Sequence, residues 1–262
     1  MQLNRYLQLA CLGLALFSAP AEAERFEYAV SGVNEPMLTN VRNHVAVFRI
    51  GNSVRFNTRL RRKLVDDAIN ATVDAMRPYG YFNPIVDVEI TPREKANWLI
   101  TVNVEPGPPV LIQDLHLGLT GPGKELKPLT TWYANFPLKQ GQVLNQVTWD
   151  KAKLDATDLL EEAGYLQAGF SRHLIRVDPV ANTARLELVV ETGPRAVMGK
   201  VIFNQDIVND GVLVSLRRFQ QGDAYHAFLL EKFRLDLWRS GFFEDIEVVE
   251  RRELTANPPR VD

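Results

Sequence analysis

The stretch Leu159-Leu160-Glu161-Glu162-Ala163-Gly164-Tyr165-Leu166 decides the fold, because its pattern occurs three times along the chain. The other copies are Ala75-Met76-Arg77-Pro78-Tyr79-Gly80-Tyr81-Phe82 and Leu237-Trp238-Arg239-Ser240-Gly241-Phe242-Phe243. Each copy reads as the end of a helix, then a glycine, then an aromatic residue. Glycine commonly follows the last turn of a helix, since it adopts a positive φ without strain. The glycines lie 84 and 77 residues apart, and a period of this kind predicts three tandem units.

A second motif recurs in the same order. Val104-Glu105-Pro106-Gly107-Pro108 matches Val190-Glu191-Thr192-Gly193-Pro194, which lies 86 residues later. One short match of this kind is expected by chance in a chain of this length. Two different motifs that recur at nearly the same period indicate a true repeat of structure.

Each unit is predicted to have the order β-α-α-β-β, which makes the chain an α+β protein. Before each Gly-aromatic pair lies an apolar stripe with the spacing of a long helix, and after it lies a segment with the alternation of a strand. The stripes are Leu60, Leu64, Ala68, Ala71 and Ala75; Ala152, Ala156, Leu159 and Ala163; and Leu230, Phe233 and Leu237. The strands are predicted around 26–30, 86–90, 98–104 and 186–190, and shorter helices around 35–48, 124–136 and 208–219. Two helices are expected to cover one face of each small sheet.

The first 23 residues are typical of a secretory signal peptide. Arg5 precedes an apolar run from Leu7 to Phe17, and Ala21-Glu22-Ala23 has the small residues that signal peptidase requires. Cleavage after Ala23 would remove Cys11, the only cysteine, so the mature chain would contain no thiol. A protein without disulfides needs no redox chemistry in an oxidising compartment.

Composition and motifs argue against several classes of function. The formal net charge of −2 lacks the basic surplus of a nucleic-acid-binding protein. The chain contains no nucleophile elbow, phosphate-binding loop or zinc-protease motif. The four histidines are scattered over different units: His44, His116, His173 and His226. We therefore predict no enzyme activity, no catalytic or metal-binding residues and no cofactor.

These features resemble POTRA domains, the periplasmic modules of outer-membrane proteins of the Omp85 superfamily. The resemblance rests on the β-α-α-β-β order, the helix-Gly-aromatic junction and the closing Val-Glu-x-Gly-Pro, and it covers residues 24 to about 252. Three units directly after a signal peptide are most similar to the translocation and assembly module subunit TamA, as is Gly141-Gln142-Val143-Leu144-Asn145-Gln146 before the second long helix. Two-partner secretion transporters and the barrel-assembly subunit share the same modules.

The resemblance implies a periplasmic docking region that acts in the insertion or secretion of β-barrel and autotransporter proteins. It also implies two kinds of partner: an inner-membrane-anchored TamB-like protein and unfolded outer-membrane protein clients. An outer-membrane β-barrel is expected downstream. The alternative from another class is a secreted enzyme whose catalytic part lies outside this chain.

The predicted domains are the signal peptide 1–23 and three POTRA-like units at 24–107, 108–194 and 195–262. The distance from glycine to closing glutamate is 25 residues in the first unit and 27 in the second. The third unit is therefore expected to be incomplete at its last strand.

Two sets of residues are candidates for binding. In POTRA domains the strand after each Gly-aromatic pair is an open edge, where an incoming strand can pair by β-augmentation. The candidate edges are 85–90, 170–177 and 243–249, with Val86, Val88, Ile90, Arg172, Leu174, Arg176, Ile246 and Val248 as contact residues. The second set is a basic patch, Arg55, Arg59, Arg61, Arg62 and Lys63, which would attract an acidic partner or anionic lipid. Acidic and basic side chains along the edges would oppose indiscriminate pairing.

Overall fold

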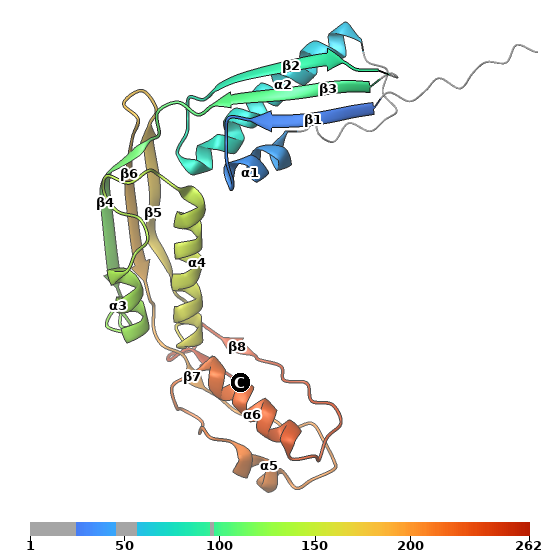
Figure 1. Ribbon diagram of the computed structural model, residues 1–262. Helices are drawn as coiled ribbons and strands as arrows, with labels where there is room; N and C mark the ends of the chain where they lie inside the picture. The colour runs from blue at the N-terminus through green and yellow to red at the C-terminus, as the bar shows by residue number, and fades with distance from the viewer. Residues whose placement is uncertain (1–24, 46–56, 95–96) are drawn as a thin grey trace, which may run out of the picture.

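The computed structural model of this chain describes residues 25–45, 57–94 and 97–262. The predicted signal peptide and Arg55 lie outside these residues. Within them the strands form three separate sheets of three strands each. Figure 1 shows the three sheets, each with its own helices, arranged one after another in a curved row.

None of the helices in the described residues combines the length and the apolar character needed to cross a membrane.

The first unit has the predicted order β-α-α-β-β. Its elements are β1 (Arg25–Ser31), α1 (Met37–His44), α2 (Thr58–Met76), the 3-10 turn η2 (Arg77–Tyr79), β2 (Ile85–Pro92) and β3 (Asn97–Glu105). The strand order is β1-β3-β2, with β1 parallel and β2 antiparallel to the central strand β3. The last strand of the unit therefore lies in the middle of the sheet, and β1 and β2 are its edges.

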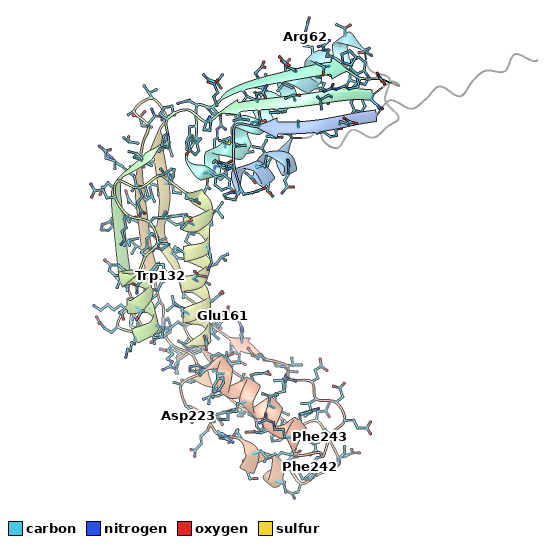
Figure 2. All side chains as sticks on the ribbon, in the orientation of Figure 1. Arg62, Trp132, Glu161, Asp223, Phe242 and Phe243 are labelled. Atoms are coloured by element: carbon cyan, nitrogen blue, oxygen red, sulfur yellow. The ribbon has the colours of Figure 1, made fainter. Side chains whose placement is uncertain are left out.

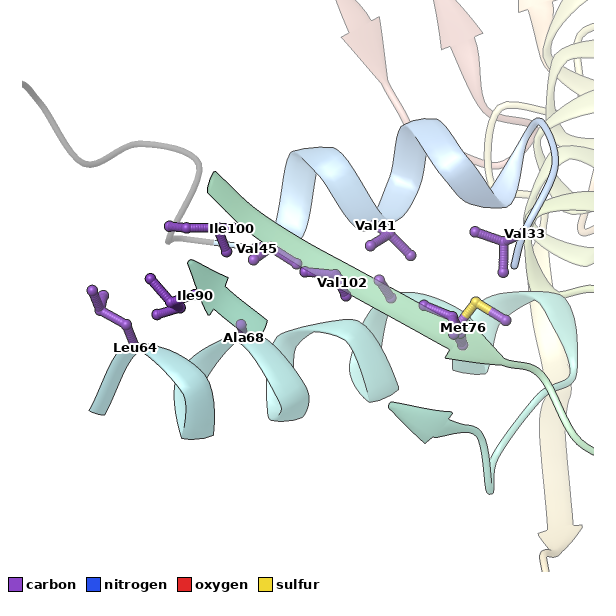
Figure 3. Close-up of a cluster of buried hydrophobic side chains, with 11 residues drawn as sticks. Val33, Val41, Val45, Leu64, Ala68, Met76, Ile90, Ile100 and Val102 are labelled. Atoms are coloured by element: carbon purple, nitrogen blue, oxygen red, sulfur yellow. The ribbon is translucent and has the colours of Figure 1, made fainter. Parts of the chain in front are cut away.

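The core of the first unit lies between the sheet and its two helices (Figure 3). Ile100, Val102 and Val104 alternate along β3 toward this core and are at most 3% exposed. The small side chains of Ala68 and Ala75 line the buried face of α2, which lets the helix approach the sheet closely. Burial of each large aliphatic side chain contributes about 1.5–3 kcal/mol, so this alternation fixes the face on which the helices lie.

The second unit repeats this arrangement with longer strands. Its elements are β4 (Leu111–Thr120), α3 (Lys127–Ala134), α4 (Gln146–Glu162), β5 (Gly169–Asp178) and β6 (Thr183–Glu191). The order is β4-β6-β5, again with one parallel and one antiparallel pair. The long helix α4 begins at Asn145, whose side-chain oxygen accepts a hydrogen bond from the backbone N–H of Thr148, just as Asn57 caps α2.

The third unit has the same order of elements but very short strands. Its elements are β7 (Val197–Met198), α5 (Asp210–Leu216), α6 (Ala227–Arg239), β8 (Arg252–Glu253) and β9 (Arg260–Val261), in the sheet order β7-β9-β8. An aromatic core holds this unit together, and the ring of Phe233 makes edge-to-face contacts with those of Phe203 and Phe219. The fold class predicted from the sequence, α+β with three units of β-α-α-β-β, is confirmed.

One predicted strand is absent from the third unit. Residues 243–249 were expected to form its open edge, but in the described chain the edge strand is β8, at Arg252–Glu253. The reason is the register of the ladder, which pairs Arg252 with Val261 and Glu253 with Arg260. In that register the partners of 243–249 would come after Asp262, so these residues have no ladder to join.

The helix ends agree with the sequence analysis in two units of three. Pro78 turns the end of α2 into η2, and Gly80 then takes φ 87°. Gly164 and Gly241 also have positive φ, 89° and 72°. Tyr81 and Tyr165 pack back against the cores of their own units as expected. Phe242 does not, since it is 42% exposed, and its neighbour Phe243 packs against the core instead.

Candidate functional site

The strand β2 is an open edge of the first sheet, because β3 borders it on one side only. Its side chains alternate strictly, with Val86 and Val88 half-buried and Ile90 buried against α2, and with Asp87 and Glu89 exposed. Ile85 at its start is 66% exposed. The predicted contact residues Val86, Val88 and Ile90 thus lie on an edge, but their side chains face the core.

The backbone of the same residues faces the other way. The N–H of Arg93 donates to the carbonyl of Asn97 at 2.7 Å, which closes the β2–β3 hairpin. Hydrogen-bonded and non-hydrogen-bonded pairs alternate along an antiparallel ladder. Counting back by twos from Arg93, the residues bonded to β3 are 91, 89, 87 and 85. Val86, Val88 and Ile90 therefore direct their N–H and C=O groups away from β3, toward the open side.

One of these outward groups is already engaged. The guanidinium of Arg61, at the start of α2, donates to the carbonyl of Ile90 at 3.0 Å. The predicted basic patch and the predicted edge thus meet at this contact. It leaves both backbone groups of Val86, both of Val88 and the N–H of Ile90 facing the open side of β2, and these groups define what we call the β2 edge.

The strand β5 is the open edge of the second sheet. Arg172, Leu174 and Arg176 are exposed and alternate along it, as predicted. Arg172 forms an ion pair with Glu187 of the central strand β6 at 3.0 Å. The register shifts between Phe170 and Arg172, so a bulge marks the start of this edge. Bulges increase the local twist and limit pairing to the strand beyond them.

The two edges carry opposite charge. The exposed side chains of β2 include Asp87 and Glu89, whereas those of β5 include Arg172 and Arg176. Oppositely charged cross-strand pairs are favourable and like charges are unfavourable. An incoming strand therefore meets an acidic row on the first unit and a basic row on the second.

The third predicted edge lies outside any strand. Ile246 packs partly against the core of the third unit, and Val248 is 44% exposed. No ladder in the described structure includes either residue.

The basic patch lies at the beginning of α2. Arg59, Arg61, Arg62 and Lys63 are all exposed there, and Figure 2 shows Arg62 at the end of the first unit. No acidic residue occupies the first turn of the helix. Positive charge at a helix N-terminus opposes the helix dipole, so these residues do not serve helix stability. Among the described residues no carboxylate forms an ion pair with Arg59, Arg62 or Lys63.

The repeated glycines have a second role that the sequence analysis missed, because they join consecutive units. The carbonyl of Gly80 accepts a hydrogen bond from the N–H of Val110, and the carbonyl of Gly164 accepts one from Ala196, both at 2.8 Å. A Cβ on Gly80 would lie 2.5 Å from the carbonyl oxygen of Leu144, and one on Gly164 would lie 2.4 Å from that of Tyr225. No side chain fits at either joint.

The residue two places after each of these glycines crosses into the next unit. Phe82 packs against the core of the second unit, and Leu166 against that of the third. Side chains add to both joints: the amide of Asn83 donates to the carbonyl of Pro179, and Arg252 forms an ion pair with Glu161. The signal for these joints was in the sequence, since Val110 and Ala196 each follow the repeated Gly-Pro motif at the same distance.

The described residues contain no group of three or more His, Cys, Asp or Glu side chains able to hold a metal ion. The most strongly perturbed titratable group is Tyr225, which is 1% exposed. Its burial, the nearby charge of Glu250 and a 3.2 Å hydrogen bond to that carboxylate raise the pKa of the phenol to about 12.

Comparison with known proteins identifies the first unit. Residues 27–106 match the family model described as POTRA domain, TamA domain 1. These bounds enclose the unit from β1 to the end of β3, and thus the β2 edge. None of the curated proteins matches the chain.

Solved structures similar to the chain include three from proteins with POTRA domains or related secretion functions. They are BamA POTRA3-5 from Haemophilus influenzae (18% identity, 95% of this chain and 97% of that one, TM-score 0.45), POTRA1-3 of Omp85 from Anabaena (17%, 91% and 91%, 0.32) and CdiB from Escherichia coli (16%, 68% and 28%, 0.25). Likenesses this distant carry no argument about function.

The assignment therefore rests on the family match to 27–106 and on the repeat of that unit's order of elements in the next two. The chain is a POTRA region of the Omp85 superfamily, and its first unit is a POTRA domain of the TamA type.

Proposed function

We propose that this chain is the periplasmic docking region of an outer-membrane protein translocation and assembly factor. It acts by binding, without covalent catalysis, and it receives extended segments of unfolded β-barrel or autotransporter clients. The observation that carries this proposal is the β2 edge, which presents a row of outward backbone groups in the unit that matches the TamA family.

Binding at this edge would be β-augmentation. The backbone groups of Val86 and Val88 pair with the main chain of any incoming strand, so affinity depends little on client sequence. Because the β2 edge is acidic and the β5 edge is basic, the charge of a client segment directs it to one or the other. Such a binding mode suits many clients that share only the extended conformation.

A TamB-like protein, anchored in the inner membrane, is the second partner that the family resemblance suggests. The basic patch at the start of α2 offers it an electrostatic contact, and the same patch suits anionic lipid headgroups. The related alternative, a two-partner secretion or barrel-assembly factor, would use the same edges for other clients.

The decisive variant is Val88→Pro, compared with Val88→Ala. Both substitutions remove the same apolar side chain from the face toward α2, but only proline removes the outward N–H. The ladder to β3 is not affected, because Val88 is in a non-hydrogen-bonded pair. The probe is a synthetic peptide with the sequence of one β-barrel strand and lysine at alternate positions, and its binding is measured by fluorescence anisotropy.

We expect Val88→Ala to bind the peptide nearly as the unmodified chain does, and Val88→Pro to lose about tenfold or more in affinity, as for the loss of one to two hydrogen bonds. Circular dichroism and amide exchange of β3 verify that both variants are folded. Equal binding by the two folded variants would show that β-augmentation at β2 is not the mechanism.

A further inference from the structure

The third unit contains a groove of about 780 Å³. One wall is formed by residues 198–205, which follow directly from β7, and the other by 245–251, which lead directly into β8. Its floor is the apolar core of the unit, formed by side chains that include Phe219, Phe233 and Leu237. Figure 1 shows β7 and β8 near the end of the chain, which is marked C beside them.

Both walls are extended segments whose backbone is not engaged. In the described structure no backbone–backbone hydrogen bond outside helices involves residues 201–207 or 242–250. Along the first wall the side chains alternate, with Val201 and Phe203 packed partly against the core and Ile202 77% exposed. This alternation is that of a β-strand which lacks its partner.

The β8 side determines which positions would pair across the groove. After the pair Arg252–Val261, Arg251 and Asp262 exchange two backbone hydrogen bonds of 2.8 and 3.0 Å. If the strand direction continues, the first position past Asp262 lies opposite Glu250 and the third opposite Val248. The fifth lies opposite Ile246, which is still on the wall.

The β7 side leads to the same result through the repeat. In the second unit β4 has a bulge after Ile112, so that Ile112, Leu115 and Leu117 face the core and pair with Ala184, Leu186 and Leu188. The corresponding residues here are Met198, Val201 and Phe203, with Met198 paired to Val261. Val201 and Phe203 therefore lie opposite the first and third positions past Asp262.

The two registers agree, and they also set the chemistry of the strand. The equivalent positions of the complete central strands are Ile100, Val102 and Val104 in β3, and Leu186, Leu188 and Val190 in β6, all at most 3% exposed. We infer that the groove binds an extended polypeptide strand that continues β9 past Asp262, pairs with both walls at once and places apolar side chains at its first, third and fifth positions.

The occupant is a segment joined to Asp262 rather than a strand of another molecule. Asp262 lies at the entrance of the groove, held by Arg251 on one side, while its side-chain carboxylate accepts a hydrogen bond from the N–H of Lys200 at 2.9 Å on the other. A free strand would have to displace these bonds to enter. This inference does not depend on client binding at the β2 edge.

The test compares two extensions of the full chain after Asp262, Val-Thr-Val-Thr-Val-Thr and Thr-Val-Thr-Val-Thr-Val. They have identical composition and opposite phase, and only the first places valine toward the core. Amide hydrogen exchange is measured on segments 201–205 and 244–250, with the β2–β3 ladder as an internal control for folding. We expect the first extension to slow exchange of both segments by about tenfold or more, and the second to leave it unchanged.

Equal protection by both extensions, or by neither, would overturn the inference. A third sample holds the unextended chain with the free peptide Val-Thr-Val-Thr-Val-Thr at a slight molar excess. We expect no protection there. Protection as strong as in the extended chain would show that the groove takes a strand from another molecule, and would overturn the assigned occupant.

Discussion

The backbone N–H of Ala196 donates to the carbonyl of Gly164 across the joint between the second and third units, at 2.8 Å. Val110 and Gly80 form the same bond at the same distance one unit earlier. In both joints the acceptor glycine has a positive φ, and its Cα faces a backbone carbonyl of the next unit. A motif that ends a helix thus also fixes the position of the following domain.

Alanine substitution of the three repeated glycines should separate these two roles. Each variant has a positive φ, which costs about 1–2 kcal/mol for alanine. Gly80→Ala and Gly164→Ala add a clash with a backbone oxygen, whereas a Cβ on Gly241 meets nothing within 4 Å. In urea unfolding we expect Gly241→Ala to lose about 1–2 kcal/mol, and the other two to lose more.

Small-angle X-ray scattering provides the second measurement for these variants. Gly80→Ala and Gly164→Ala should broaden the distance distribution because a joint is forced apart, and Gly241→Ala should not change it. Equal losses and equal scattering for all three would mean that the glycines act only as helix ends.

Tyr225 predicts how stability depends on alkaline pH. Its pKa is raised from 10.0 to about 12 in the folded chain, first by burial and then by Glu250. The folded state therefore holds the phenolic proton more tightly than the unfolded state. The resulting stability is fully present below pH 10 and is lost as the pH rises through 12, at about 1.4 kcal/mol per pH unit between these values.

The measurement is the free energy of unfolding of the unmodified chain and of Tyr225→Phe, at about pH 8 and about pH 11. Near pH 8 the variant should lose about 1 kcal/mol, since it lacks the hydrogen bond to Glu250. Near pH 11 the gap between the two proteins should shrink or reverse, because phenylalanine has no proton to lose. A gap that does not change with pH would contradict the raised pKa.

The charges on the two edges predict selective binding. Peptides of alternating valine with lysine, and of alternating valine with glutamate, should prefer the β2 edge and the β5 edge respectively. Two cross-strand charge pairs correspond to about three- to tenfold in affinity at low salt. The double variant Asp87→Lys, Glu89→Lys should reverse the preference of the first unit, as followed by amide shifts in NMR spectra.

Sodium chloride is the control for this selectivity, because added salt screens exposed charges. The preference should disappear at about 1 M salt, where the Debye length is about 3 Å, while backbone pairing remains. If the two peptides bind equally well to both edges at low salt, charge does not direct clients.

The basic patch predicts a separate response to membranes. Vesicles containing phosphatidylserine should bind the unmodified chain, and the double variant Arg62→Glu, Lys63→Glu should bind about tenfold or more weakly, since each basic residue near such a surface contributes about 1 kcal/mol. Arg61→Ala is the matched comparison, because Arg61 is already bonded to Ile90. Cosedimentation measures the effect. Loss of binding in Arg61→Ala but not in the double variant would contradict this role for the patch.

The sequence was sufficient for whatever depends on local pattern. Alternation located β2, β3 and β6, and apolar stripes located α2, α4 and α6, because burial of one face imposes these periods. The edge positions of β2 and β5 followed from the family resemblance. The direction of the backbone groups did not, since it depends on how Arg93 and Asn97 close the hairpin.

Long-range contacts were the part that pattern did not reveal. Gly80 and Val110 are thirty residues apart, and neither is unusual on its own. The third edge was misplaced for a similar reason: alternation near 243–249 is real, but a strand also needs a partner in register, and the pairing of Arg252 with Val261 moves that partner past Asp262. The burial of Phe243 in place of Phe242 likewise depends on the tertiary core.

The joints at Gly80 and Gly164 have a mechanical consequence. Each combines a backbone hydrogen bond, a side chain inserted into the next core and a polar contact farther out, so rotation about the joint would break all three together. The array behaves as a stiff arm, and a pull on one end is transmitted to the other instead of being absorbed by a hinge. The distance between the acidic and the basic edge is then a property of the arm itself, like the spacing of marks on a ruler.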